Sequence, residues 1–266
     1  STLARRSDGL LRIEGLEKAF GLRQQRVVEG FDLAMGRGEF VTLIGPSGCG
    51  KTTVLRIAAG LLAPTAGEVF VDEQPSMGPS RDKAIVFQHF NLFPWRTAID
   101  NVAYGLEIQG MGKSERRAVA MDYLKLVGLD THASHYPWQM SGGQQQRIGI
   151  ARALAINPKL LLMDEPFGAL DALTREHLQG QLARICSERD LTILFVTHSI
   201  DEALYLSDRI VVMGVQPGRI IAEFKVDLPK PRADYNFRAL PEYSRVRGEI
   251  WGLLEQHLQR AEATAS

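Results

Sequence analysis

The feature that most constrains the fold is a glycine-rich loop set between an apolar run and a helical pattern. Residues 45–52 read Gly-Pro-Ser-Gly-Cys-Gly-Lys-Thr and fit the pattern G-x-x-x-x-G-K-[ST], directly after the apolar run 40–44 and before the helix-forming run 53–61. In a strand–loop–helix unit of this kind, backbone N–H groups and the helix N-terminus point at phosphate oxygens. The alternative is an ordinary glycine-rich turn that matches by chance. We therefore predict a nucleotide-phosphate site in an α/β fold.

Two side chains of this loop suit a nucleotide. The Lys51 ammonium would supply a point charge to the β- and γ-phosphates, and the Thr52 hydroxyl would ligate Mg²⁺. The other contacts are expected from the backbone of the loop and of the helix start. The residues predicted to bind the nucleotide here are Gly45, Pro46, Ser47, Gly48, Cys49, Gly50, Lys51, Thr52 and Thr53.

A second apolar run ends in two adjacent carboxylates. Residues 160–163 are Leu-Leu-Leu-Met, and Asp164 and Glu165 follow. Neighbouring side chains near a strand end point in different directions, so the two carboxylates can have different roles. We expect Asp164 to reach the water shell of a metal ion and Glu165 to orient or activate the attacking water as a general base. The alternative is an ordinary acidic turn after a strand.

The pattern along the chain predicts a parallel α/β core with a helical insertion. Short, uncharged apolar runs suit central strands buried on both faces of a sheet, and helical patterns alternate with them. The strand runs are 40–44, 84–87, 160–163 and 193–196, and the helical stretches include 53–61 and 173–189. The stretch 114–155 is helical in pattern and carries no strand signal.

Beyond Gly218 the pattern changes. Pro229-Lys230-Pro231 breaks regular structure, and apolar residues then recur at helical spacing. This spacing predicts an amphipathic helix that packs on something. Its apolar residues are Val246, Ile250, Leu253, Leu254 and Leu258.

Composition narrows the classes of partner. The 266 residues carry a formal net charge of zero, so no field across the whole molecule argues for nucleic acid or an anionic membrane surface. Two cysteines, Cys49 and Cys186, are too few for a disulfide framework, which favours a reducing compartment. No apolar run approaches the roughly 18–20 residues that span a bilayer, and the N-terminus lacks a signal-type apolar stretch. We expect a cytosolic chain that reaches a membrane only through a partner.

The segment Ser141-Gly142-Gly143-Gln144 narrows the class further. Together with Gln88, Asp171 and His198 in this order, it resembles the ATP-binding-cassette (ABC) ATPases through about residue 225. The resemblance implies a P-loop NTPase (RecA-like) parallel core with an antiparallel β portion and a helical subdomain. It also divides the chain into an ABC ATPase domain at 1–225, with the helical subdomain inserted at about 96–155, and a C-terminal extension at 226–266.

The same resemblance implies a head-to-tail homodimer or pseudo-dimer that buries two ATP molecules. Each ATP, with Mg²⁺, would lie between the phosphate loop of one subunit and residues 141–144 of the other. A helix N-terminus preceded by Ser-Gly-Gly offers N–H groups and a hydroxyl to a γ-phosphate. The alternative reading is that Ser141 caps the helix, and capping uses the same groups.

Further roles follow one residue at a time from the resemblance. Gln88 matches a glutamine that contacts Mg²⁺ and the attacking water, and His198 matches a switch histidine at the γ-phosphate. Asp171 resembles an aspartate that communicates across the dimer. Phe20 stands where an aromatic ring stacks on adenine. The alternatives are solvated polar residues for Gln88 and His198, and a buried core side chain for Phe20.

The chain looks most like the nitrate/sulfonate/taurine importer branch of this family. The cues are residues 92–95 with 100–102, residues 164–171, and residues 216–220. The branch implies a transport-coupled ATPase on the cytoplasmic side of the inner (plasma) membrane. Its partners would be integral-membrane permease subunits and, indirectly, a periplasmic or surface substrate-binding protein.

The aromatic stretch 90–95 is the segment we expect to dock on the permease, because exposed apolar clusters tend to be docking surfaces. Core packing is the alternative for any single ring. A soluble, non-transport ABC ATPase that acts on a macromolecular partner is the alternative for the whole chain. The solute never touches this subunit, so its identity is not encoded in this sequence.

Overall fold

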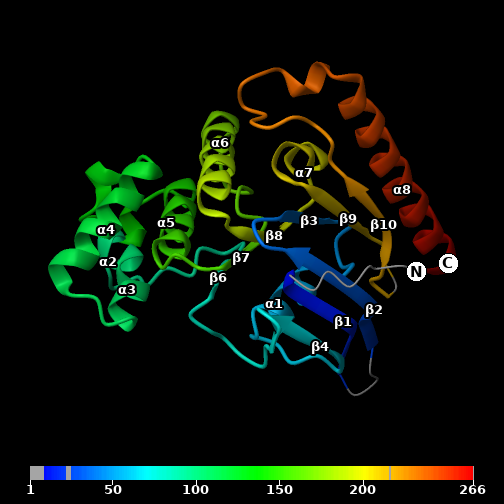
Figure 1. Ribbon diagram of the computed structural model, residues 1–266, viewed down its shortest axis with the longest axis horizontal. Helices are drawn as coiled ribbons and strands as arrows, with labels where there is room; N and C mark the ends of the chain where they lie inside the picture. Colours follow the sequence, from blue (N-terminus) through cyan, green and yellow to red (C-terminus); the bar gives the residue numbers. More distant parts are fainter. Residues whose placement is uncertain (1–8, 22–24, 216, 266) are drawn as a thin grey trace. The chain divides into compact units, whose positions relative to one another are not determined.

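The computed structural model of the chain describes residues 9–21, 25–215 and 217–265, with side chains to residue 259 (Figure 1). The N-terminal stretch discussed above and Gln216 lie outside the described residues. The chain divides into two compact units, one of Ser1–Pro79 with Ala183–Ser266 and one of Ser80–Leu182. The helix α6 (Ala172–Arg189) includes the point at which the two ranges meet. Each unit is described by itself.

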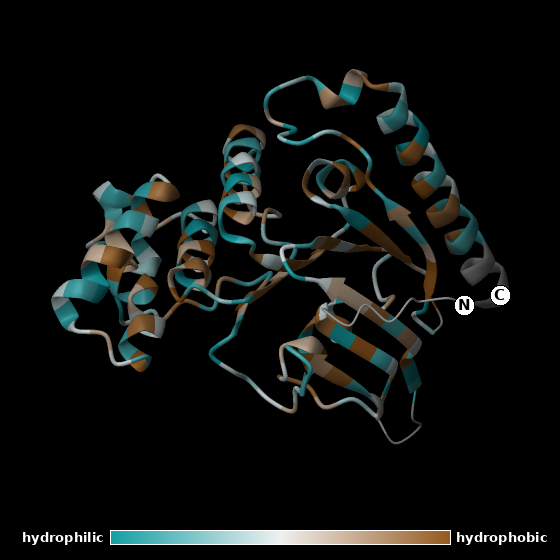
Figure 2. Cartoon of the chain, viewed as in Figure 1, coloured by the Kyte–Doolittle hydropathy of each residue, from teal (hydrophilic) through white to brown (hydrophobic). Residues whose placement is uncertain are grey.

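The first unit begins with an antiparallel sheet. Its strands, in the order β2-β1-β4-β5, are β1 (Gly9–Phe20), β2 (Gln25–Gly36), β4 (Ala66–Val71) and β5 (Gln74–Pro75). In β1, Ile13 lies opposite Leu33 of β2 and Val69 of β4, and all three side chains are buried. Apolar and polar residues alternate along these strands, as the colours in Figure 2 show, so the sheet has one buried and one solvated face.

The same unit holds a set of mainly parallel strands. They are β3 (Phe40–Ile44), β8 (Thr192–Thr197), β9 (Arg209–Met213) and β10 (Ile220–Lys225). Strand β3 pairs in parallel with β8 on one side and with β9 on the other, and β10 is antiparallel to β9. Every residue of β3 and β8 is buried, which confirms the two runs predicted as central strands.

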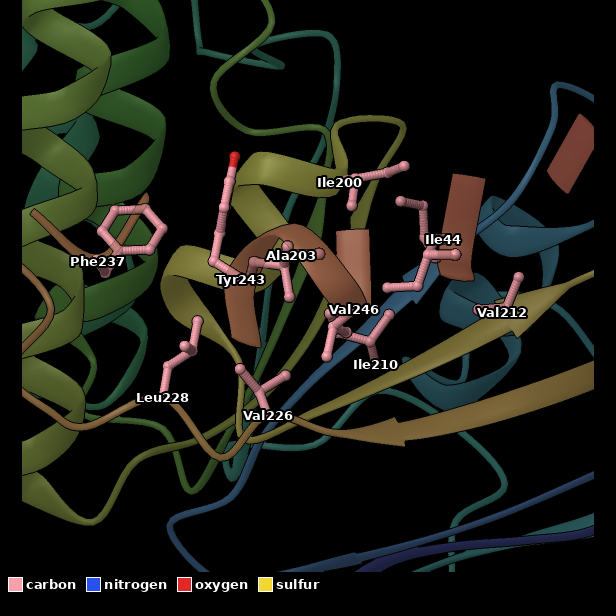
Figure 3. Packing of buried hydrophobic residues seen from close by; sticks show 12 residues of the cluster. Ile44, Ile200, Ala203, Ile210, Val212, Val226, Leu228, Phe237, Tyr243 and Val246 are labelled. Carbon is pink, nitrogen blue, oxygen red and sulfur yellow. The ribbon is translucent and has the colours of Figure 1, made fainter. Parts of the chain in front are cut away.

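Helices pack on these strands. They are α1 (Lys51–Ala58), α7 (Ile200–Leu206), the short 3₁₀ helix η3 (Phe237–Ala239) and α8 (Pro241–Ala265). Helix α1 contacts β8, while α7 contacts β3, β8 and α8. The sheet, α7 and the C-terminal extension share one hydrophobic cluster, much of which Figure 3 shows from close by.

The predicted amphipathic helix is present as α8. Val246 and Ile250 are buried in that cluster, and Leu254 packs against it. Leu253 is half-buried, whereas Leu258 is 44% exposed, so placing Leu258 on the packed face was wrong. The cluster ends before that turn of the helix.

The second unit pairs two parallel strands with a group of helices. Strands β6 (Lys83–Val86) and β7 (Leu160–Asp164) are parallel, and Phe87, expected in the first of them, lies just beyond its end. The helices are α2 (Ala98–Val102), α3 (Tyr104–Ile108), α4 (Lys113–Leu126), η1 (Asp130–His132), η2 (Pro137–Gln139) and α5 (Gly142–Ala155). The stretch 114–155 is therefore helical and free of strands, as its pattern predicts.

No helix among the described residues is long and apolar enough to cross a membrane. Both cysteines, Cys49 and Cys186, are free thiols.

Candidate functional site

The glycine-rich loop lies between β3 and α1 in the first unit. Gly50 is the N-cap of α1 and has a φ of 94°, and a Cβ there would also lie 2.6 Å from Val28 Cγ2. Gly45 has no room for a side chain, because a Cβ would lie 2.6 Å from the carbonyl oxygen of Met213. These two positions require glycine, one for its conformation and both for its size. The loop therefore approaches its surroundings through bare backbone, as a phosphate cradle needs.

Lys51 is folded back onto its own loop. Its ammonium group donates hydrogen bonds to the carbonyl oxygens of Gly45 at 2.7 Å and Pro46 at 2.9 Å, and the side chain is only 7% exposed. Thr52 and Thr53 follow in the first turn of α1 and are half-buried. Neutral carbonyl oxygens are weaker partners for an ammonium group than an anion is, so the Lys51 side chain remains available to an anion entering the loop.

His198 follows the end of β8 and is exposed. The turn that carries it is fixed by its neighbours: the Ser199 N–H donates to Thr197 Oγ1 at 3.1 Å, and Thr197 Oγ1 donates to Glu202 Oε2 at 2.5 Å. Ser199 caps α7 by accepting a bond from the Glu202 N–H at 3.3 Å. These bonds tie the histidine turn to the first turn of α7.

Phe20 closes β1 and is 44% exposed, so the alternative of a buried core side chain is wrong. The Lys18 ammonium lies 5.0 Å from the centre of its ring. An exposed ring of this kind has a face that can stack on a planar ligand.

In the second unit, Asp164 and Glu165 stand where β7 ends. Asp164 is the last residue of the strand and is 4% exposed, whereas Glu165 is half-buried with a φ of 45°. A non-glycine residue in this left-handed region stores strain, and such residues gather at functional sites. The side-chain amide of Gln88 donates a hydrogen bond to Glu165 Oε2 at 3.3 Å. Two residues that the sequence places 77 positions apart are thus side by side.

The segment 141–144 opens helix α5 with a reciprocal cap. The Gln144 N–H donates to Ser141 Oγ at 3.2 Å, and the Ser141 N–H donates to Gln144 Oε1 at 2.9 Å. The capping reading is therefore confirmed, and the Ser141 hydroxyl still has its own proton to donate. The side-chain nitrogen of Gln144 also lies 3.3 Å from His132 Nε2.

The two glycines of this segment bring three loops together within the second unit. A Cβ on Gly142 would lie 3.3 Å from the Phe90 ring, and one on Gly143 would lie 3.3 Å from a methyl of Leu170. The start of α5 thus packs on the segment after Gln88 and on the segment before Asp171. The sequence pattern predicts phosphate contact for these glycines and carries no signal of this packing role, which depends on residues far away in the chain.

Asp171 is exposed at the start of α6, where its Oδ1 accepts a hydrogen bond from the Thr174 N–H at 3.0 Å. The bonds from the Thr174 backbone and side chain hold the pKa of Asp171 below its ordinary value. The residue is therefore ionised at neutral pH and stabilises the helix start.

The aromatic stretch 90–95 is mostly packed. Phe93 lies 4.5 Å from the Tyr104 ring, centre to centre, and is half-buried, as are Phe90 and Leu92. Trp95, in contrast, is 72% exposed. The buried Asn101 side chain bonds both backbone groups of Phe93, at 2.8 and 3.1 Å, and so fixes the loop that presents Trp95.

The comparisons with known proteins agree on one family. Residues 28–168 match a family profile described as ABC transporter. A bicarbonate transport ATP-binding protein of Synechococcus elongatus is 45% identical over 92% of this chain and 38% of its own length. A taurine import ATP-binding protein of Rhizobium johnstonii is 42% identical over 92% of this chain and 96% of its own length.

A similar solved structure is a dimeric ATP-binding cassette in a post-hydrolysis state bound to ADP and Pi. It is 37% identical, with a TM-score of 0.76 over 81% of this chain and 98% of that chain. The fold class predicted from the sequence, an α/β P-loop core with an antiparallel β portion and a helical part, is confirmed by this likeness.

Proposed function

Because this chain belongs to the ABC transporter family, as an ATP-binding subunit that hydrolyses ATP, we propose that it energises uptake of a small solute through a separate membrane permease. The importer-type names of its relatives favour this reading over a soluble ATPase that acts on a macromolecule. The solute class that we propose is a small polar anion or zwitterion of the nitrate, sulfonate, taurine or bicarbonate kind. Relatives of nearly equal identity are named for taurine and for bicarbonate, so the cassette sequence leaves the choice within that class open.

The observation that carries the catalytic part of the proposal is the hydrogen bond between Gln88 and Glu165. It puts a carboxylate and an amide together at the end of β7, where both could contact the same water molecule. In this proposal Glu165 is the general base or water-positioning group, and His198 contacts the γ-phosphate. Lys51 leaves its loop carbonyls to neutralise the β- and γ-phosphates.

A magnesium ion fits the residues that the sequence singles out. Among the described residues, no group of three or more His, Cys, Asp or Glu side chains could hold a metal by itself. Mg²⁺ characteristically keeps several waters and binds through few protein oxygens plus substrate phosphates. In this proposal Thr52 and Gln88 would each contact the ion, and Asp164 would act through water. The ion would neutralise charge that develops on the phosphates.

The proposal extends to a head-to-tail homodimer in which the segment 141–144 of one subunit contacts ATP held by the other. The solved relative is a dimer, and the Ser141 cap leaves the hydroxyl proton available to be donated to an anion at the start of this helix. Phe20 would stack on the adenine, and Asp171 would act across the dimer.

The remaining partners belong to the same proposal. Trp95 is the residue that we propose to dock on the permease, which would hold the chain at the cytoplasmic face of the inner (plasma) membrane. A periplasmic or surface substrate-binding protein would supply the solute. As a working division, residues 1–225 are the ATPase domain, with a helical subdomain at about 96–155, and residues 226–266 are the extension.

A mixed dimer tests the composite site. One chain carries Lys51→Ala and a first tag, the other carries Ser141→Arg and a second tag, and dimers are purified through both tags. In the proposed arrangement one site has both lesions and the other has none, so a photoreactive ATP analogue labels one site per dimer. If each site were built from one chain, both sites would carry a lesion, and loss of labelling at both would contradict the proposal.

Uptake in cells tests the transport role. Cells that lack this chain would be complemented with the wild type or with Glu165→Gln, and uptake of labelled taurine, nitrate and bicarbonate would be measured. The proposal expects uptake of at least one solute to return with the wild type alone. Equal uptake of all three with and without the chain would contradict the proposed solute class.

A further inference from the structure

The C-terminal helix α8 reaches a carboxylate next to the His198 turn. The Tyr243 hydroxyl donates to Asp201 Oδ1 at 2.6 Å, and Arg247 Nε donates to the same oxygen at 2.9 Å. Asp201 belongs to the first turn of α7, the helix whose cap ties it to the His198 turn. We call Tyr243, Arg247 and Asp201 the Asp201 clamp.

The clamp is an electrostatic contact as well as a geometric one. Burial alone would raise the pKa of Asp201, but the bonds from Tyr243 and Arg247 outweigh burial and hold that pKa below its ordinary value. Burial and the same bond raise the pKa of Tyr243. The carboxylate is therefore ionised and the phenol protonated at neutral pH, which is the pairing that a strong charge-assisted bond requires.

Apolar packing between helices α8 and α7 supports the clamp. Tyr243, Val246 and Ile250 lie on one face of α8 and share a hydrophobic cluster with Ile200 and Ala203 of α7 (Figure 3). The ring of Phe237 meets that of Tyr243 edge to face at 5.4 Å between centres. Since Tyr243 is only 8% exposed, its hydroxyl has little freedom to move away from Asp201.

The extension also holds the other end of α7. Arg232, 4% exposed, donates from Nη1 to the carbonyl oxygens of Tyr205 at 3.0 Å and Ser207 at 2.8 Å. A cation at the C-terminal carbonyls and an anion in the first turn both suit the dipole of the helix. Residues of the C-terminal extension therefore form hydrogen bonds at both ends of helix α7.

We propose that Tyr243 and Arg247 are positioning residues for ATP hydrolysis, which act through Asp201 on the first turn of α7 and so on His198. The inference rests on the proposed role of His198 at the γ-phosphate. The route is continuous, because Ser199 and Glu202 join that turn to the segment that carries the histidine. Fixing the turn stabilises the orientation of His198 needed in the transition state, and it leaves the phosphate loop, where ATP binds, unaltered.

Steady-state kinetics of the purified full chain test this inference. Tyr243→Phe and Arg247→Ala should each lower kcat about threefold to tenfold, with the KM for ATP within about twofold of the wild type. Arg247→Lys should recover part of the loss, because it keeps a charged donor. The matched control is Arg245→Ala, since among the described residues Arg245 pairs only with Glu242 and Glu249 of its own helix. Its kcat should not change.

Two measurements separate positioning from support of the fold. Thermal unfolding shows whether each variant is folded at the assay temperature. The second measurement combines each substitution with Asp201→Asn. If Tyr243 and Arg247 act through the Asp201 carboxylate, the effects of the two substitutions on kcat should not add. Folded Tyr243→Phe and Arg247→Ala variants with wild-type kcat would overturn the inference.

The variant His198→Ala separates failure of the clamp inference from failure of the proposed role of His198. If His198→Ala loses hydrolysis while the clamp variants keep it, only the clamp inference is overturned. If His198→Ala keeps wild-type kcat, the proposed role of His198 falls, and the clamp inference falls with it.

Discussion

Gly218 lies against the carbonyl group of Cys49, so close that a Cβ on residue 218 would come within 1.9 Å of the Cys49 oxygen. Backbone bonds hold Gly218 there: its N–H donates to Val27 at 2.9 Å, and its carbonyl accepts from Glu29 at 3.1 Å. Both groups in this close approach belong to the backbone, so neither can rotate away as a side chain could. The phosphate loop therefore packs at Cys49 against Gly218, a residue that lies far from the loop in the sequence.

Replacing Gly218 by Ala should disturb the phosphate loop, although Gly218 itself is not one of the residues proposed to bind nucleotide. We expect the overpacked variant to lose about 1–3 kcal/mol of unfolding free energy and to bind ATP more weakly. Thermal unfolding and calorimetric titration with a slowly hydrolysed ATP analogue check both. The control is Gly248→Ala in α8, where a Cβ meets nothing within 4 Å, and which should leave ATP affinity unchanged. Wild-type affinity in Gly218→Ala would show that the loop tolerates the shift.

The local parts of the fold could be predicted from the sequence, because their causes are local. The run 40–44 is uncharged and apolar along its whole length, and it forms β3 with every residue buried. The carboxylates at 164 and 165 follow another run of this kind, 160–163, and they stand at its end in the structure. Motif spacing alone was enough to place the candidate residues on their elements.

Contacts between distant residues could not be predicted in the same way. Nothing near Cys49 shows that Gly218 will press on it, and nothing near Asp201 shows that Tyr243 and Arg247 will bind it. The exposure of residues 90–95 could not be predicted from that segment either, because it depends on contacts with Asn101 and Tyr104, which follow the segment in the chain. Apolar periodicity in a single helix likewise predicts which face is apolar, but it does not predict how far along the helix the packed cluster extends. Leu258 continues the apolar pattern and is nevertheless exposed, because the cluster ends before it.

Removing the Lys51 ammonium should weaken nucleotide binding itself. Lys51→Ala deletes the charge proposed to face the phosphates, so we expect the Kd for a slowly hydrolysed ATP analogue to rise about tenfold to a hundredfold. Isothermal titration measures this, and Arg56→Ala, an exposed cation later in the same helix, serves as the control. An unchanged Kd would mean that Lys51 only holds the loop carbonyls.

Cys186 should react slowly with thiol reagents in the folded chain. Burial raises its pKa to about 12, so at pH 8 its thiolate fraction is roughly a thousandth of that of an ordinary cysteine. Since a raised pKa favours the protonated thiol, labelling by iodoacetamide should still be rising with pH above pH 9. Mass spectrometry of labelled peptides, native against unfolded chain, checks this. Native labelling that levels off near pH 9 would contradict the assignment.

Truncating Trp95 should weaken binding to the permease and leave the isolated chain intact. An exposed aromatic anchor at an interface is worth about 2 kcal/mol, roughly thirtyfold in affinity, whereas its loss from a surface hardly changes stability. Assembly of Trp95→Ala with the permease subunits and its melting temperature should be measured together. Phe93→Ala is the contrast, because Phe93 packs on Tyr104 and should lower the melting temperature first. Full assembly of a folded Trp95→Ala chain would remove Trp95 from the interface.

The most direct test of the central claim, that this chain hydrolyses ATP through the carboxylate at the end of β7, is phosphate release by Glu165→Gln. The substitution keeps the size of the side chain and removes the base, so we predict that release falls by about 10²–10⁴-fold while ATP binding is retained. Glu115→Gln, an exposed carboxylate of α4, should release phosphate at the wild-type rate. Phosphate release by Glu165→Gln within a few-fold of the wild type would contradict the account.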